Sequence, residues 1–253
     1  MNLLTIADGF GDSVAVPPWY PDYIKWPEII KLMTKGVNLT NLSRYGAGNE
    51  YIANAIQQNI DNCDVAIVQW AQPNRLDLVL DHIEPHNTIW KTTIANDPVY
   101  SNNIIELGNT KIWLSSGSTT NLVKEYHSKF ISLAQHQLRS QMYINYVMLL
   151  LEQKKINYKF MLSVDSQYLS NKITTTPWAW HSEWKGMCEF RFVSKFSELD
   201  LGLTQPIPLI HFDFIKQFIM PSINLPWRSE RELNAVESML YRKYQEAITN
   251  KPI

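Results

Sequence analysis

The 253 residues include 23 Lys and Arg against 24 Asp and Glu, which gives a formal net charge of −1. A chain with so little net charge has no overall field that would draw it to nucleic acid or to an anionic membrane, so we expect neither as a partner. Hydrophobic residues make up 45% of the chain and aromatic residues 12%. That content supports a substantial core and excludes a disordered or fibrous protein.

The first half of the chain alternates short apolar runs with helical periodicity. Continuous apolar runs predict strands that are buried on both faces of a sheet. Pro27 suits the first turn of a helix, and Gly36 suits the end of the same helix. The predicted order is a strand at Asn2–Ala7, a helix from Pro27, a strand at Val37–Ser43, a helix at Glu50–Ile60 and a strand at Asp64–Trp70.

Two irregular segments interrupt this pattern in the second half, at residues 80–119 and 166–199. We expect both to be surface excursions, the first with a small hairpin. The remaining predicted elements are a long helix at about Thr120–Gln153, a strand at Asn157–Val164, a helix from near Ile210 that ends before Pro221, and a last helix at residues 229–248. Ser229 and Glu232 form the capping box of that last helix. No repeat or linker divides the chain, so residues 1–253 are predicted to be a single domain.

Strands that alternate with helices predict parallel βαβ units and a sheet covered on both faces. We therefore predict an α/β fold: a three-layer α/β/α sandwich with a mostly parallel, five-stranded sheet in flavodoxin-like winding. Ligand sites in such sheets lie beyond the carboxyl ends of the strands. The residues to inspect are accordingly those that follow the apolar runs, Asp8–Ser13, Arg44–Asn49 and Ala71–Arg75.

These loops and one later segment carry the residue types of a serine-hydrolase site. Gly11-Asp12-Ser13 follows the first strand, Gly48 and Asn49 begin a helix, and Asn74 follows the central strand; Asp200–His211 leads into an apolar helix. Together these blocks resemble the SGNH (GDSL-type) hydrolase family over Met1 to about Ile223. The strand end Gln69–Arg75 is similar to that of SGNH-like proteins in tailed phages.

The resemblance implies the SGNH hydrolase fold and two alternative alignments of its triad. In the first, Ser13 is the nucleophile and His211 its base, with N–H groups near Gly48 and the amide of Asn49 or Asn74 as the oxyanion hole.

In the second alignment, the loop Asp8-Gly9 directly after the strand takes the nucleophile's place. Gly9, Gly202 and Gln205 then stand where the serine, aspartate and histidine of the triad belong. Glycine has no nucleophile, and glutamine cannot accept a proton near neutral pH. We favour this alignment, because the losses at the two ends of the triad support each other.

Two classes of function follow from the resemblance. One is a non-catalytic SGNH-fold protein that binds a glycan or is part of a virion, with other virion proteins as partners. The other is an active serine esterase or deacetylase that uses Ser13 on acylated glycans. We expect no cofactor and no metal in either case, since the acidic and histidine residues Asp77, Asp81, His82 and His86 match no strong ligand spacing and are better explained as surface polarity.

Each candidate residue also has a structural interpretation. Ser13 suits an ordinary turn, His211 suits a cap of the helix that begins near it, and Asn49 suits a helix N-cap. The tryptophan cluster of the second excursion could stack on sugar rings, but we favour a packing role for it: Trp178, Trp180 and Trp184.

The N-terminus has no basic segment followed by a long apolar one, so we expect no signal peptide. The longest apolar stretch, Tyr146–Leu151, is too short to span a bilayer. Cys63 and Cys188 are expected to be free thiols in a reducing compartment. With the resemblance, these features predict a location in the host cytoplasm or the phage virion.

Overall fold

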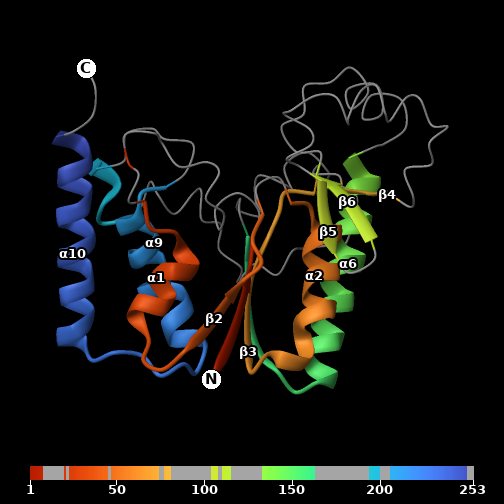
Figure 1. The fold of residues 1–253 in the computed structure, drawn as a ribbon, viewed down its shortest axis with the longest axis horizontal. Coiled ribbons are helices and arrows are strands. Elements are labelled where there is room, and N and C mark those ends of the chain that lie inside the picture. The colour runs from red at the N-terminus through yellow and green to blue at the C-terminus, as the bar shows by residue number, and fades with distance from the viewer. Residues whose placement is uncertain are drawn as a thin grey trace.

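The computed structural model describes residues 1–7, 20, 23–44, 47–73, 77–80, 104–107, 110–114, 133–162, 194–199 and 206–249. Within these ranges, a parallel sheet of four strands lies between two layers of helices (Figure 1). The strand order is β2-β1-β3-β7, with β1 at Asn2–Ile6, β2 at Asn38–Asn41, β3 at Val65–Trp70 and β7 at Asn157–Leu162. The predicted α/β fold with a parallel sheet is confirmed, but the described residues contain four of its strands and not the predicted five.

Side-chain alternation along the central strands builds a separate core on each face of the sheet. In β3, Val65 and Ile67 belong to one core, whereas Ala66, Val68 and Trp70 belong to the other. Successive residues of a strand point to opposite faces. All six residues of β3 are buried, so its continuous apolar run reflects helices on both sides.

One face of the sheet is covered by helices that are far apart in sequence. Helix α1 (Trp26–Met33) packs beside α9 (Pro208–Phe214) and α10 (Glu230–Thr249). The other face carries α2 (Asn49–Asn59), the 3-10 turn η3 (Ile60–Asn62) and α6 (Leu133–Gln153). Figure 1 shows the two helical layers on opposite sides of the strands.

The chain reverses its direction across the sheet after β2. It passes from β1 through α1 to β2 on one side, then returns through α2 to β3 on the other side of β1. This reversal puts a topological switch point between β1 and β3, and ligands of open α/β sheets bind outside the carboxyl ends of the strands at such a point.

The predicted helix ends are correct at some places and wrong at others. Helix α1 ends at Met33, and Gly36, three residues later, adopts the positive φ of 62° that favours glycine. The helix predicted from Ile210 begins at Pro208. It does not stop before Pro221, because a π-helical turn η5 (Ile215–Ile219) and a 3-10 turn η6 (Met220–Ser222) continue it. Proline has no N–H for an α-helical hydrogen bond, which agrees with the change of helix type here.

A small antiparallel sheet joins the first excursion to the residues just before it. Its strands are β4 (Asp77–Leu80), which leads into the excursion, and β5 (Ile104–Leu107) and β6 (Thr110–Leu114) within it, in the order β4-β6-β5. The predicted hairpin is confirmed as the β5–β6 pair. Residues 120–132 of the predicted long helix, residues 163–164 of the predicted last strand and nearly all of the second excursion lie outside the described residues.

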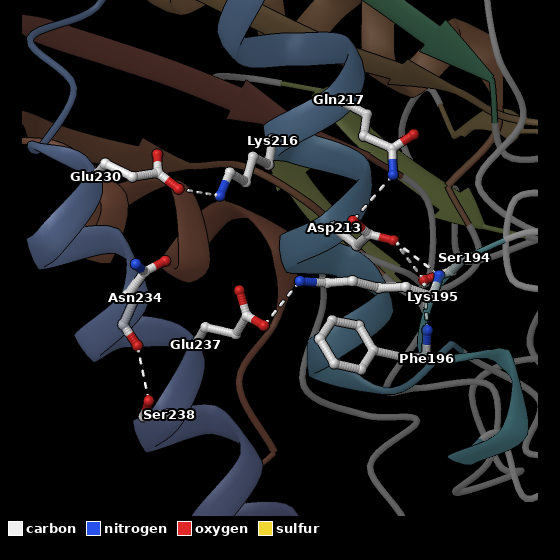
Figure 2. A network of polar contacts seen from close by, with 10 residues as sticks. All are labelled: Ser194, Lys195, Phe196, Asp213, Lys216, Gln217, Glu230, Asn234, Glu237 and Ser238. Carbon is white, nitrogen blue, oxygen red and sulfur yellow. Dashed lines mark hydrogen bonds and ion pairs between the residues drawn. The ribbon is translucent and has the colours of Figure 1, made fainter.

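The last residues of the second excursion are fastened to the C-terminal helices by a polar network (Figure 2). The buried carboxylate of Asp213 in α9 accepts hydrogen bonds from the Ser194 hydroxyl at 2.7 Å, the Lys195 N–H at 3.2 Å and the Gln217 amide at 3.0 Å. Lys195 also forms a 2.8 Å ion pair with Glu237 of α10. Asp213 therefore ties residues 194–199, including the 3-10 turn η4 (Ser197–Leu199), to this layer.

One half of the predicted capping box of α10 is confirmed, because the Ser229 N–H donates to Glu232 Oε2 at 2.9 Å. The Ser229 hydroxyl donates to the same carboxylate oxygen at 2.7 Å. Glu232 also pairs with Lys35 at 2.8 Å, which links the end of the α1 region to α10.

Candidate functional site

The structure places three of the predicted site residues among its described parts. Gly48 and Asn49 lie at the start of α2, beyond the carboxyl end of the sheet, while His211 lies within α9 on the opposite face. The remaining candidates lie outside the described residues: Asp8, Gly9, Ser13, Asn74, Gly202 and Gln205. Neither of the two alternative triads is therefore described in full.

The N-terminus of α2 is bound by the carboxylate of Asp77, the first residue of β4. Asp77 Oδ1 accepts the N–H of Gly48 at 2.8 Å, and Oδ2 accepts the N–H of Tyr51 at 2.7 Å. Asp77 is only 3% exposed. The first N–H groups of a helix lack partners within the helix and carry the positive end of its dipole. Asp77 thus supplies, from 26 residues away, the acceptor that an N-cap side chain ordinarily provides.

Gly48 is required by the close approach of this carboxylate. A Cβ atom at position 48 would lie 2.7 Å from Asp77 Oδ2 and 2.9 Å from its Cγ. Such distances are shorter than van der Waals contact, so any side chain would displace Asp77. Gly48 is the N-cap residue and makes no side-chain capping bond of its own.

Asn49 connects the start of α2 to the end of β3. Its Oδ1 accepts the Ala71 N–H at 2.9 Å, and its Nδ2 donates to the Ala71 carbonyl at 3.2 Å. This buried side chain therefore completes the backbone hydrogen bonds of the residue that follows β3. The interpretation of Asn49 as the N-cap is wrong, because Gly48 takes that position and Asn49 is the first helical residue.

His211 is fully buried in α9. Its ring meets the Tyr23 ring edge-on, with 6.2 Å between the centroids, and neither ring nitrogen makes a hydrogen bond. Burial lowers the pKa of His211 to about 3, and the nearby Pro206 carbonyl offsets only part of this effect. The capping interpretation is wrong, since the helix begins three residues earlier at Pro208.

Gln69 is a second buried polar residue on the face that α9 covers. It alternates with Val65 and Ile67 along β3 and is fully buried, yet neither its amide nitrogen nor its amide oxygen has a hydrogen-bond partner. Leaving a buried polar atom unpaired costs on the order of 1–3 kcal/mol. The carboxyl end of the sheet therefore carries polar groups that its core does not satisfy.

A small polar recess of about 20 Å³ lies beside the Asp77–Gly48 contact, between α2, α6 and the first residue of β4. Arg139 of α6 and Glu50 of α2 form an ion pair of 3.0 Å across it. Burial raises the pKa of Tyr143, and the charge of Glu50 adds to this effect. All but one of the residues that line the recess have polar side chains: Asn49, Glu50, Pro73, Asp77, His136, Arg139, Ser140 and Tyr143.

Chemically, this arrangement offers hydrogen-bond donors and acceptors. Burial raises the pKa of the free Cys63 thiol to about 11, so it is not a reactive thiolate at neutral pH. Within the same described ranges, no three His, Cys, Asp or Glu side chains are placed to hold a metal ion.

Asp77 is the residue that sequence interpretation missed. We expected it at the surface, and that expectation is wrong because its carboxylate is buried on the start of α2. One sequence signal could have indicated it. A helix that begins at Gly48 has no capping side chain, so its first N–H groups need an acceptor from another part of the chain.

No helix in the described parts of the chain combines the length and apolar character needed to cross a bilayer. A scan against protein-family models, a search of curated proteins and a search of solved structures each found no match to this chain. The resemblance to SGNH hydrolases therefore stays a prediction.

Proposed function

We propose that this chain is a non-hydrolytic protein of SGNH-like fold that binds a glycan through the polar recess beside α2. The observation that carries the proposal is the carboxylate of Asp77 on the N–H groups of Gly48 and Tyr51. Its resemblance to proteins of tailed phages supports a role in a virion, alongside other virion proteins.

An acyl-transfer enzyme needs free N–H donors where negative charge develops on the substrate oxygen. Here the N–H of Gly48 already donates to an internal carboxylate. An oxyanion about 4 Å from that carboxylate would be repelled by about 4 kcal/mol at an effective dielectric constant near 20. That energy corresponds to roughly a thousandfold loss of rate, so this helix start opposes the chemistry that the family performs there.

His211 is also poorly suited to act as a general base. Its ring is fully buried beside Tyr23, and a pKa of about 3 leaves it a weak proton acceptor at neutral pH. A histidine that activates a serine must reach the hydroxyl group directly or through one water molecule.

The recess has the chemistry of a site for a hydroxyl-rich ligand. Glu50, Arg139 and Ser140 present acceptors and donors side by side on α2 and α6, and Tyr143 adds an aromatic ring. The charges of Glu50 and Arg139 compensate each other, which favours a neutral ligand over an ion.

The first test measures hydrolysis of p-nitrophenyl acetate and butyrate by the purified chain and by Ser13→Ala. We expect both proteins to show the same rate as the buffer with a matched concentration of an inert protein. Hydrolysis by the wild type that disappears in Ser13→Ala would refute the non-hydrolytic proposal and favour the esterase.

The second test measures binding of glucose, galactose and N-acetylglucosamine by saturation-transfer NMR. We expect at least one sugar to show transfer that falls at least fivefold in Arg139→Gln. Lys195→Gln is the matched control, because Lys195 forms its ion pair on the opposite helical layer. Equal signals for the two variants, or no transfer from any sugar at millimolar concentration, would contradict glycan binding at the recess.

A further inference from the structure

Helix α6 exposes a row of large apolar side chains on the side that faces away from its own core. Ile144, Val147 and Leu151 pack inward against the sheet and α2. The outward residues are far more exposed than large apolar residues usually are in a surface helix: Leu138 48%, Met142 62%, Tyr146 42% and Leu149 62%. Contiguous exposed apolar surface of this kind marks an interaction site.

These four residues follow the spacing of a helix–helix contact. The steps between them are four, four and three residues, which keeps them on one face of the helix. Such spacing is close to the 3.5-residue repeat with which helices interdigitate in coiled coils. Figure 1 shows α6 at the outer edge of its layer, with α2 on its inner side.

The row is also complementary to itself when two copies run antiparallel. With the two-fold axis near residues 143–144, Leu138 of one copy lies opposite Leu149 of the other, and Met142 lies opposite Tyr146. Each apolar residue thus meets an apolar residue, and antiparallel helices place opposite dipole ends together.

Charge does not oppose this pairing. Between Leu133 and Leu151, Arg139 is the one charged residue of α6, and it is held by its ion pair with Glu50 of α2. The rest of the outward face carries uncharged polar residues beside the apolar row, including Gln135 and Asn145. A polar rim around an apolar centre is the usual composition of a protein interface.

The available area indicates how strong the contact would be. Large side chains contribute about 150–200 Å² each when fully exposed, so the four exposed fractions amount to roughly 300–400 Å² per copy. With its polar rim, α6 can approach the roughly 1,000 Å² in total that the smallest specific interfaces bury. We propose that two copies of this chain associate through an antiparallel α6–α6 contact, a weak and reversible association because the interface is at the small end of the specific size range.

Sedimentation equilibrium between 1 and 200 µM tests the proposal. We expect the wild type to shift from monomer to dimer over this range, and Met142→Glu and Tyr146→Lys each to weaken association at least tenfold. Tyr241→Glu is the matched control, because Tyr241 is a similarly exposed aromatic residue on α10 (45%), and this variant should dimerise like the wild type. Circular dichroism would show that each variant retains its fold.

Mixing the two variants tests the register. Met142 faces Tyr146 of the other copy only in the antiparallel arrangement, so an equimolar mixture of Met142→Glu and Tyr146→Lys should recover dimer through a Glu–Lys pair. A wild type that stays monomeric at 200 µM, or a dimer that survives in Met142→Glu, would overturn the proposal. Failure of the mixture to recover dimer would overturn the antiparallel register.

Discussion

The substitution Asp77→Asn tests whether the Asp77 carboxylate stabilises the start of helix α2. The side chain keeps its shape, but one carboxylate oxygen becomes an NH₂ group. Because both oxygens of Asp77 accept a backbone N–H, at 2.8 and 2.7 Å, the new NH₂ group must face a donor. One charge-assisted hydrogen bond is lost, together with the attraction between the carboxylate and the helix dipole.

The expected cost follows from those two losses. A hydrogen bond to a charged group contributes about 1.5–3 kcal/mol, and a charge at a helix N-terminus contributes about 0.3–1 kcal/mol. We therefore expect Asp77→Asn to lower the free energy of unfolding by about 2–4 kcal/mol. With a urea m-value of about 3 kcal/mol/M, the unfolding midpoint would fall by roughly 1 M.

Urea unfolding followed by circular dichroism provides the measurement, with Asp61→Asn as the matched control. Asp61 also belongs to the α2 region, but its side chain is 77% exposed and forms a surface ion pair with Lys154. Such a pair contributes at most about 1 kcal/mol. If Asp77→Asn lowers the free energy of unfolding no more than Asp61→Asn does, the Asp77 carboxylate does not stabilise the start of α2. The N–H of Gly48 would then not be occupied as the structure shows.

Three further predictions concern Gly48, His211 and Asp213. Gly48→Ala should lower the unfolding midpoint in urea by at least as much as Asp77→Asn, because its Cβ would lie 2.7 Å from Asp77 Oδ2; a wild-type midpoint would contradict the contact. For His211, the pKa falls from 6.5 in the unfolded chain to about 3 in the folded protein. Between pH 3 and pH 6.5, the unfolded chain therefore binds a proton on this ring that the folded protein does not bind. Unfolding free energy should be lost as pH falls from 6.5 towards 3, by about 1.4 kcal/mol per pH unit relative to His211→Leu; equal slopes for the two proteins would show that the ring is not buried. Asp213→Ala should speed proteolytic cleavage near residues 194–199 by about tenfold or more, since Asp213 holds Ser194 and Lys195; an unchanged cleavage rate, measured by mass spectrometry, would be evidence against that anchor.

The parts of the fold that sequence predicts well are those that depend on local pattern. The apolar run at Val65–Trp70 is continuous because both faces of β3 are covered, and such a run can be recognised without a structure. The bond from the Ser229 N–H to the Glu232 carboxylate is equally local, because it spans three residues.

The candidate site depends on contacts between distant segments, which local pattern does not encode. Asp77 lies 26 residues from Tyr51, and Asn49 lies 22 residues from Ala71. Nothing in the neighbourhood of Asp77 distinguishes a buried helix cap from a polar surface residue. The exposed row on α6 is hard to predict for a related reason, since apolar residues lie on both the inward and the outward face of this helix and blur the helical pattern.

The proposed non-hydrolytic function requires that no serine at the carboxyl end of the sheet is activated. Incubation with a fluorophosphonate ester, followed by intact-mass and peptide mass spectrometry, tests it directly, because such reagents modify serines that a base has activated. We predict no adduct on Ser13 and the same mass profile for the wild type and Ser13→Ala. A stoichiometric adduct on Ser13 that is absent from Ser13→Ala would contradict the claim.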